Sequence, residues 1–404
     1  MALLVCKFGG SSVATLDRIK NIAVRVQKLQ QEYRDIVVVV SAMGDTTDDL
    51  LEMAQEISND LSCREMDMLL STGEQQSAAL LALTLNSIGI KAISLTGWQA
   101  GIKSDSTHSK AKISAIENQR IREEISSGNV VVVAGFQGIN CEGDITTLGR
   151  GGSDTTAVAL AASLRADRCM IFTDVNGVYT ADPRLVHEAQ KIERISYEEM
   201  LELASLGAVV MQPRAVEFAM VYNVDVEVRS SFNEEPGTII TEGSGMEQQK
   251  VVQGIAHDRN CAKIAIFDVP DRPGIAKALF SSLAEHKINV DMVIQAAMRD
   301  EVNDIAFTIE RNELGMALPV VEQLVAEIGA SGMSYGDNVA KISVVGAGMK
   351  SNPGVAAAVF TALADANINI QMISTSEIKI SCIIDESQVA EAVQTLHNKF
   401  NLDK

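Results

Sequence analysis

Residues 273–292 read PGIAKALFSSLAEHKINVDM, and residues 353–372 read PGVAAAVFTALADANINIQM. The two stretches are identical at ten of twenty positions without a gap. A strand-like run precedes each copy, at Cys261–Val269 and at Val339–Val345. The elements expected after the copies are strands Asp304–Ile309 and Glu377–Ile384 and helices Ala317–Ile328 and Ser387–Phe400. This repeated β-α-β-β-α order predicts two tandem ferredoxin-like α+β modules.

The chain before about residue 245 follows a different pattern, in which short β-branched runs alternate with amphipathic stretches. The expected strands are Ile36–Val40, Lys91–Leu95, Val130–Ala134 and Cys169–Thr173, and the expected helices are Leu16–Tyr33, Thr47–Ile57 and Gly73–Asn86. A β-α-β order predicts an α/β domain with a mostly parallel sheet between helical layers, which binds ligands at the carboxyl ends of its strands. The polar stretch 234–249 marks a boundary, so we expect domains at 1–245, 246–337 and 338–404.

The composition of the 404 residues, 47% hydrophobic and 22% charged, is that of a folded globular protein. A net charge of −19 repels nucleic acid and anionic lipid, and it would also repel ATP or a dicarboxylate unless the site concentrates its own cations. Six scattered cysteines favour neither a disulfide framework nor a zinc site. No apolar run approaches the ~20 residues of a membrane span, and no basic leader precedes Leu3–Phe8. We therefore expect a cytoplasmic protein without nucleic-acid or membrane partners.

The first motif is Lys7-Phe8-Gly9-Gly10-Ser11-Ser12, at the end of the first expected strand. Two glycines let the backbone approach a ligand and present amide donors to phosphate oxygens, while Lys7 supplies a positive charge. The chain contains no Walker A motif. The alternative interpretation is a tight turn beside a surface lysine.

The second motif is Gly149-Arg150-Gly151-Gly152-Ser153-Asp154-Thr155-Thr156, which leads into an alanine-rich helical run. Glycines before a helix amino terminus create an anion site, and an arginine there can bind a carboxylate with two hydrogen bonds. The alternative is a helix capped by Ser153 or Asp154, with the glycines serving only the turn.

The third motif, at 173–184, reads TDVNGVYTADPR and leaves another buried strand. Tyr179 could stack on a base, Asp174 and Asp182 could hold ribose hydroxyls or Mg²⁺-bound water, and Arg184 could reach phosphate. The alternative is a turn-rich loop with solvated charges.

Two polar loops complete the set of motifs, one at 41–47 after a strand and one at 71–74 before an expected helix. Their hydroxyls could hold an amino acid, and Glu74 is the natural partner for its ammonium group. The alternatives are that Thr47 caps a helix and that Glu74 is a charge in a first helical turn.

Together, and in this order, KFGGSS, VVVVSAMGDTT, STGEQQSA, LGRGGSDTTA, TDVNGVYTADPR and PRAVEFA, followed by the paired Pro-Gly modules, resemble the aspartate kinases along essentially the whole chain. The resemblance is to monofunctional bacterial enzymes with two C-terminal ACT domains. It implies an amino-acid-kinase fold followed by two ferredoxin-like ACT domains, and transfer of a phosphoryl group from Mg·ATP to L-aspartate.

The resemblance also implies residue roles. Lys7 and Asp154 would be catalytic. ATP would be bound by Lys7, Gly9, Gly10, Ser41, Thr173, Asp174, Tyr179, Asp182 and Arg184. Aspartate would be bound by Thr47, Glu74, Arg150, Gly151, Gly152 and Ser153. We expect no dedicated protein metal site besides the Mg²⁺ that accompanies ATP.

ACT domains usually pair edge to edge and bind amino acids at the junction, so the resemblance implies lysine or threonine as effectors and a homodimer or larger assembly. The effector-binding candidates are Asp271, Gly274, Ile275, Ala276, Asn289, Val290, Asp291, Gln295, Val355, Ala356, Asn369, Ile370, Ser376 and Glu377. The alternative is that these modules serve only as a dimerisation platform.

One departure concerns Val209, which stands where related enzymes usually have a lysine that contacts the nucleotide. Loss of that cation predicts weaker ATP binding. Two rival functions stay open at this point. Another amino-acid kinase, such as a glutamate or N-acetylglutamate kinase, shares the Lys-x-Gly-Gly start, and a non-catalytic amino-acid sensor would account for Val209.

Overall fold

The computed structural model describes residues 2–58, 62–206, 210–243, 250–296, 301–349 and 352–404. The chain forms two compact units. The first contains Met1–Val178 and Lys191–Met246, and the second contains Tyr179–Gln190 and Glu247–Lys404. None of the helices in the described ranges is long and apolar enough to cross a membrane.

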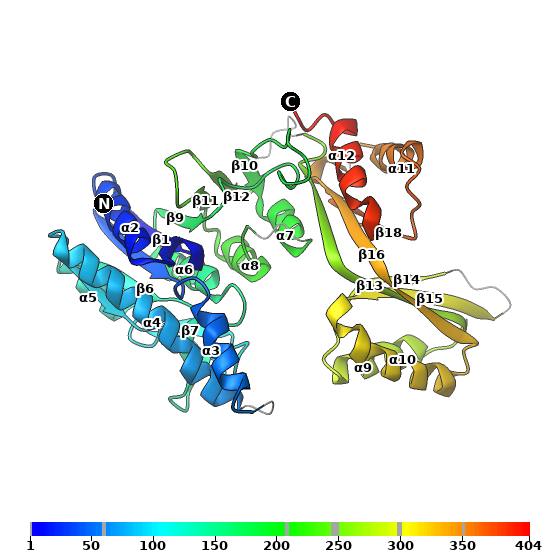
Figure 1. The fold of residues 1–404 in the computed structure, drawn as a ribbon, viewed down its shortest axis with the longest axis horizontal. Helices are drawn as coiled ribbons and strands as arrows, with labels where there is room; N and C mark the ends of the chain where they lie inside the picture. The colour runs from blue at the N-terminus through cyan, green and yellow to red at the C-terminus, as the bar shows by residue number, and fades with distance from the viewer. Residues whose placement is uncertain (1, 59–61, 207–209, 244–249, 297–300, 350–351) are drawn as a thin grey trace. The chain divides into compact units, whose positions relative to one another are not determined.

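An eight-stranded sheet forms the core of the first unit, in the order β10-β12-β11-β9-β1-β2-β6-β3 (Figure 1). Its strands are β1 (Leu3–Phe8), β2 (Asp35–Val40), β3 (Ala92–Leu95), β6 (Val130–Ala134), β9 (Arg168–Thr173), β10 (Arg194–Ser196), β11 (Val226–Ser230) and β12 (Thr238–Thr241). Neighbouring strands are parallel except for the antiparallel pair β11 and β12. This confirms the predicted mostly parallel sheet.

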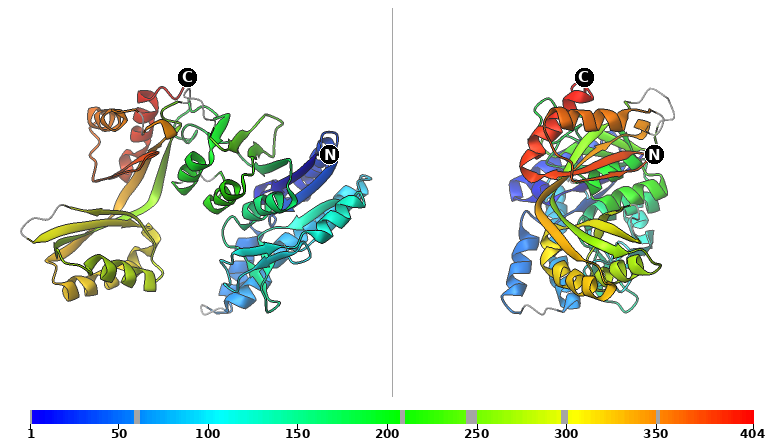
Figure 2. Two further views of the ribbon diagram at one scale, coloured as in Figure 1. Left: turned by 180° about the vertical axis from the view of Figure 1, so that it is seen from behind. Right: turned by 90° about the vertical axis from the view of Figure 1, so that its right-hand side faces the viewer.

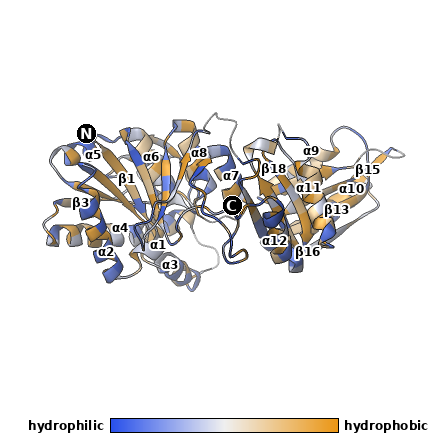
Figure 3. Ribbon diagram, turned by 90° about the horizontal axis from the view of Figure 1, so that it is seen from above, coloured by the Kyte–Doolittle hydropathy of each residue, from blue (hydrophilic) through white to orange (hydrophobic). Residues whose placement is uncertain are grey.

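Helices cover both faces of this sheet. They are α1 (Gly10–Val13), α2 (Leu16–Leu29), α3 (Thr46–Gln55), α4 (Cys63–Ser87), α5 (Gln119–Ser126), α6 (Gly152–Leu164), α7 (Tyr197–Ser205) and α8 (Pro213–Tyr222). Leu4, Cys6 and Phe8 of β1 pack in one core with residues of α2 and α4. Because side chains alternate along a strand, Lys7 lies on the opposite face, where it meets α6. Figure 3 shows the hydrophobic residues along β1 and α6.

A small second sheet lies beside these layers in the order β5-β4-β7-β8. Its strands are β4 (Ile102–Ser104), β5 (Ile113–Ile116), β7 (Gln137–Ile139) and β8 (Ile145–Thr147). The strand β8 contacts α4 and leads into the turn before α6. The small sheet thus supports the segment that carries the second motif.

The prediction for residues 71–74 was wrong. These residues are not a loop before a helix, because α4 begins at Cys63 and runs through them to Ser87. Gly73 suggested a helix start, but it serves packing: a Cβ at this position would lie 2.9 Å from the Cβ of Ala42. Glu74 therefore lies in the middle of α4, which excludes the alternative of a first-turn charge.

A six-stranded antiparallel sheet runs through the second unit in the order β14-β15-β13-β16-β18-β17. Its strands are β13 (Gly254–Pro270), β14 (Val290–Gln295), β15 (Val302–Ile309), β16 (Gly332–Val345), β17 (Met372–Thr375) and β18 (Lys379–Asp385), and its helices are α9 (Ile275–Glu285), α10 (Leu314–Ile328), α11 (Val355–Asp365) and α12 (Val389–Lys399). Two apolar cores, one for each module, confirm the α+β prediction.

The two modules share their long strands β13 and β16, which Figure 2 shows side by side. The first residues of β13 pair with the last residues of β16, so that Gly254 lies opposite Val345. Ile255 accordingly belongs to the core of the second module. The expected boundary between residues 337 and 338 falls inside β16, which is one continuous strand from Gly332 to Val345.

The segment Tyr179–Gln190 belongs to the second unit although the third motif is continuous in sequence. Ala181 and Val186 pack in the apolar core that contains α12. Thr180 Oγ1 lies 2.9 Å from Nε2 of the fully buried His397, a residue of α12. These contacts divide the motif, because Thr173 and Asp174 remain with the first unit.

Candidate active site

A cavity of about 490 Å³ opens in the first unit where β1, β2 and the start of α6 come together. Ten of the residues predicted for substrate binding or catalysis line it: Lys7, Gly10, Ser41, Thr47, Glu74, Arg150, Gly151, Gly152, Ser153 and Asp154. The first, second and both polar-loop motifs therefore share one site. The parallel strands β1 and β2 bring the first motif and the loop 41–47 together at their carboxyl ends, while the packing of α6 against β1 and of α4 against β2 adds the second motif and Glu74.

Lys7 and Asp154 form the charged centre of the cavity. Lys7 Nζ lies 2.6 Å from Asp154 Oδ1, and both side chains are about nine-tenths buried. β1 supplies the lysine, and the first turn of α6 supplies the aspartate. A surface lysine beside a turn, the alternative for the first motif, is thereby excluded.

The glycine pair after β1 allows a close approach between two loops. A Cβ on Gly10 would lie 3.1 Å from the carbonyl oxygen of Ala42, and the Gly10 carbonyl accepts a hydrogen bond from Gly44 N at 3.1 Å. Gly9 N donates to Phe172 O, which ties this loop to β9. Gly9 itself is not a lining residue of the cavity, and a Cβ on it would lie 3.3 Å from Lys7 Nζ. The two loops consequently form one rigid wall of the site.

Glu74 enters the cavity from α4. Its Oε1 accepts a hydrogen bond from Ala42 N at 3.1 Å, whereas its buried Oε2 has no hydrogen-bond partner in the described parts of the chain. Burial raises the pKa of Glu74 to about 7, against the opposing effect of its backbone hydrogen bonds. An unpartnered carboxylate oxygen in a cavity is a good acceptor for an ammonium group.

The second motif forms the turn into α6. Gly149 and Gly151 have φ of 76° and 69°, in the left-handed region that favours glycine. Gly151 is the residue before the helix and no side chain caps it, so the alternative of a cap by Ser153 or Asp154 is wrong. Arg150 is exposed, and no described residue accepts a hydrogen bond from its guanidinium group. Among the described residues its guanidinium group is thus unpaired, and anion binding by Arg150 stays a prediction.

Thr47 is the second residue of α3, whose cap position is Asp45, so Thr47 does not cap that helix. The residues of the third motif lie outside the cavity lining. Thr173 ends β9, next to β1 in the sheet, and its hydroxyl donates to Asp174. Tyr179, Asp182 and Arg184 belong to the second unit. Their nucleotide-binding roles stay predictions.

In that second unit Arg184 donates to Asp182, and this contact lowers the pKa of Asp182. Val209 lies outside the described residues, so the structure does not address its replacement of lysine.

The effector candidates occupy equivalent places in the two modules of the second unit. Gly274 and Gly354 precede α9 and α11 with φ of 103° and 105°. Ile275, Ala276, Val355 and Ala356 follow in the first turns; Asn289, Val290, Asp291 and Gln295 lie at or in β14; Asn369, Ile370, Ser376 and Glu377 flank β17; and Asp271 follows β13. Asp291 forms an ion pair with the buried Lys341, which the sequence did not indicate. Effector binding stays a prediction for all of them.

The sequence analysis missed several residues around the cavity. Met66, Leu70 and Phe136 supply apolar lining, and Ser109 and Thr147 supply polar lining. The carboxyl group of Asp67 lies behind them and is fully buried. The sequence offered one signal for Asp67, which stands between two methionines in a helical stretch. An aspartate on an apolar face is buried, and a buried carboxyl group needs hydrogen-bond partners.

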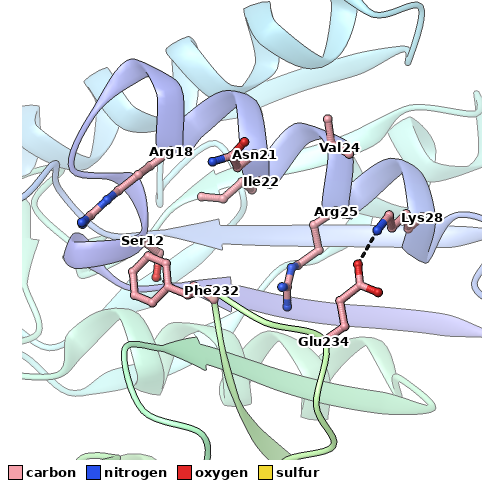
Figure 4. A pocket seen from close by; sticks show the side chains of 10 residues that line it. Ser12, Arg18, Asn21, Ile22, Val24, Arg25, Lys28, Phe232 and Glu234 are labelled. Carbon is pink, nitrogen blue, oxygen red and sulfur yellow. Dashed lines mark hydrogen bonds and ion pairs between the residues drawn. The ribbon is translucent and has the colours of Figure 1, made fainter.

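A second cavity, of about 210 Å³, lies between α2 and the segment 231–234 (Figure 4). Its cations are already engaged within the chain: Arg18 lies over the Phe232 ring, Arg25 donates to Ser230 O, and Lys28 pairs with Glu234. These contacts fasten α2 to the loop after β11. The cavity is thus a structural junction without a free cation among its described lining residues.

Comparison with known proteins agrees with this architecture. Residues 2–230 match the amino acid kinase family, and residues 263–329 and 342–400 each match an ACT domain. An aspartate kinase from Stutzerimonas stutzeri strain A1501 is 52% identical over 405 residues, which is 100% of this chain and 98% of that protein.

Two solved structures of E. coli aspartokinase III are also similar, and each match covers 99% of this chain and of that one at 25% identity. One is in complex with aspartate and ADP (R-state), with a TM-score of 0.82. The other is in complex with lysine and aspartate (T-state), with a TM-score of 0.76. On these findings, together with the shared cavity, the chain belongs to the aspartate kinase family of ATP-dependent phosphotransferases and has an amino acid kinase domain followed by two ACT domains.

Proposed function

We propose that this chain transfers the γ-phosphoryl group of Mg·ATP to the side-chain carboxylate of L-aspartate, giving 4-phospho-L-aspartate and ADP. The observation that carries the proposal is the convergence of Lys7, Asp154, Glu74 and Arg150 on one cavity. The related E. coli structure in complex with aspartate and ADP supports the same pair of ligands.

Glu74 and Arg150 match the charged groups of an amino acid. The unpartnered Oε2 of Glu74 would accept from the α-ammonium group, and the free guanidinium of Arg150 would bind the α-carboxylate. Thr47, Gly151, Gly152 and Ser153 would add hydrogen bonds from the cavity wall. With both main-chain groups held, the side-chain carboxylate would point to Lys7.

The acceptor needs no general base, because a carboxylate is already ionised at neutral pH. The site must instead bring two anions together and neutralise the charge that spreads over the phosphoryl oxygens. Lys7, held in place by Asp154, would supply that charge, and Gly10 and Ser41, which line the cavity, would contact the phosphates. Gly9, next to Lys7 Nζ, would leave room for that side chain.

Mg²⁺ bound with ATP would supply positive charge that offsets the charge of the phosphates. The described residues contain no group of three acidic, histidine or cysteine side chains that could hold a metal. Asp154 is the acidic side chain paired with Lys7, and it could orient a hydrated ion. This donor set fits an ion that ATP brings with it.

We further propose that the ACT domains bind the end products lysine or threonine and regulate the enzyme, that the reaction is the first step of lysine, threonine and methionine biosynthesis, and that the chain forms a homodimer or larger assembly in the cytoplasm. The E. coli structure in complex with lysine and aspartate supports a lysine effector. The proposed cytoplasmic location rests on the six cysteines, which are all free, because free thiols are typical of a reducing compartment.

The test is a hydroxamate assay for acyl phosphate with ATP, Mg²⁺ and aspartate, with glutamate and N-acetylglutamate as alternative acceptors. Lysine and threonine are then added separately and together. Aspartate-dependent product supports the proposal. Turnover with another acceptor would indicate a different amino-acid kinase, and no turnover with any acceptor would indicate the non-catalytic sensor.

A further inference from the structure

Two charged residues behind the cavity hold the same two chain segments. The segments are 108–111, in the loop before β5, and 147–148, at the end of β8 and directly before Gly149. A hydrogen bond from Ala111 N to Thr147 O, 2.9 Å long, joins them. An aspartate and an arginine secure this junction from two different helices.

Asp67 of α4 binds the donors of the two segments. Its carboxylate accepts from Ser109 N at 3.0 and 3.1 Å and from Thr147 Oγ1 at 2.5 Å. His108 Nδ1 lies 2.7 Å from Oδ2. The side chain of Asp67 has no exposed surface, so all of its interactions lie within the protein.

Arg214 of α8 binds the acceptors of the same segments. Its two terminal nitrogens donate to Ala111 O and to Leu148 O, each at 2.8 Å. Arg214 is the second residue of α8, where the helix dipole disfavours a cation, so the two carbonyl groups compensate an unfavourable position. Burial also lowers the pKa of Arg214, and the guanidinium remains charged.

The secured junction is in direct contact with the turn that carries Arg150. A Cβ on Gly149 would lie 3.1 Å from Ser109 O, and a Cβ on Gly151 would lie 1.8 Å from Cγ of Gln212, two residues before Arg214. Since the turn has no side chain of its own that caps α6, its shape depends on these neighbours.

We propose that Asp67 and Arg214 are positioning residues for the amino-acid substrate: they join segments 108–111 and 147–148 into one support that orients Arg150. This inference rests on the proposed function and adds to it the groups that determine affinity for aspartate. Neither residue contacts the reacting atoms, so their loss affects aspartate binding and leaves ATP binding intact.

The test compares Arg214→Met, which removes both donors at similar length, with Arg214→Lys, which keeps the charge without the forked geometry. Arg120→Lys, at an exposed position in α5, is the matched control. For each full-length variant, kcat/KM for aspartate, the KM for ATP and the thermal shift caused by aspartate are measured. The wild-type hydroxamate reaction is run first, because its failure would refute the proposed function and not the positioning role.

We expect kcat/KM for aspartate to fall at least tenfold in Arg214→Met and less in Arg214→Lys, with the KM for ATP within twofold of wild type. Asp67→Asn should resemble Arg214→Met. In an Arg150→Ala background the further effect of Arg214→Met should almost disappear, because the residue acts through Arg150.

Three results would overturn the inference. The first is that Arg214→Met and Arg150→Ala lower kcat/KM for aspartate by independent factors that multiply in the double variant. The others are an equal loss of affinity for ATP and aspartate, and an unchanged kcat/KM and thermal shift with aspartate in both Arg214 variants. If Arg214→Met does not fold, the same comparisons are made with Arg214→Lys, whose retained charge keeps the buried site compensated.

Discussion

We predict that aspartate binding depends on pH through the carboxyl group of Glu74. Its pKa of about 7 results from burial, it lines the cavity, and its Oε2 has no hydrogen-bond partner among the described residues. A substrate ammonium group requires the ionised form of this carboxyl group. We therefore expect kcat/KM for aspartate to rise with pH through the neutral range.

The magnitude follows from a single ionisation. With a pKa of about 7, the ionised fraction is about 0.09 at pH 6 and about 0.9 at pH 8, so kcat/KM should increase about tenfold. Glu74→Gln keeps the size of the side chain and removes its charge. Loss of a hydrogen bond to a charged group costs about 2 kcal/mol, which is ~30-fold in the KM for aspartate.

The assay measures initial rates of ADP release at saturating Mg·ATP from pH 6 to pH 8. Glu65→Gln, an exposed position in the same helix, is the control and should keep the wild-type profile. A wild-type profile that is flat over this range, or a slope that survives in Glu74→Gln, would refute the assignment of Glu74 to the ammonium group.

Three further predictions concern the charged centre, the turn and the second unit. Lys7→Ala should lower kcat about 100-fold or more, because it removes the fixed cation; a kcat within threefold of wild type would exclude Lys7 from the chemistry. Gly151→Ala should impair aspartate binding through its clash with Gln212, whereas Gly143→Ala, with φ of 89° and open space around it, should leave kinetics unchanged. Burial lowers the pKa of His397, so the unfolded chain binds the proton more readily and the melting temperature should fall as pH drops below about 6.5. His397→Gln should make the melting temperature fall less as the pH drops. An unchanged dependence of the melting temperature on pH in this variant would contradict the role of His397.

Part of the cavity lining could be predicted because these residues lie at strand ends. Lys7 is the next-to-last residue of β1, and Ser41 follows β2, the strand that pairs with β1. Parallel pairing of β1 and β2 then brings both residues to the edge of the sheet that contains the carboxyl ends of the strands. The sequence also predicted a glycine turn before a helix at 149–152; the left-handed φ angles of glycines 149 and 151 explain why this turn favours glycine.

The start of α4 could not be predicted in the same way. Glycine is a weak helix former, so Gly73 suggested a boundary, but its small size is needed for contact with Ala42. The division of the third motif between the two units could not be predicted either. Its continuous sequence concealed that Thr180 bonds to His397, more than two hundred positions away, and thereby joins the second unit.

The order and spacing of its motifs determined that this chain has a parallel-sheet kinase domain, a glycine turn before a helix and two repeated α+β modules. Local geometry suffices there, because strand ends, turns and repeats are properties of neighbouring residues. Tertiary structure alone decided that Asp67 and Arg214 hold the Arg150 turn from behind, and that Glu74 titrates near neutral pH. Both depend on burial and on partners tens of positions away, which a one-dimensional pattern does not contain.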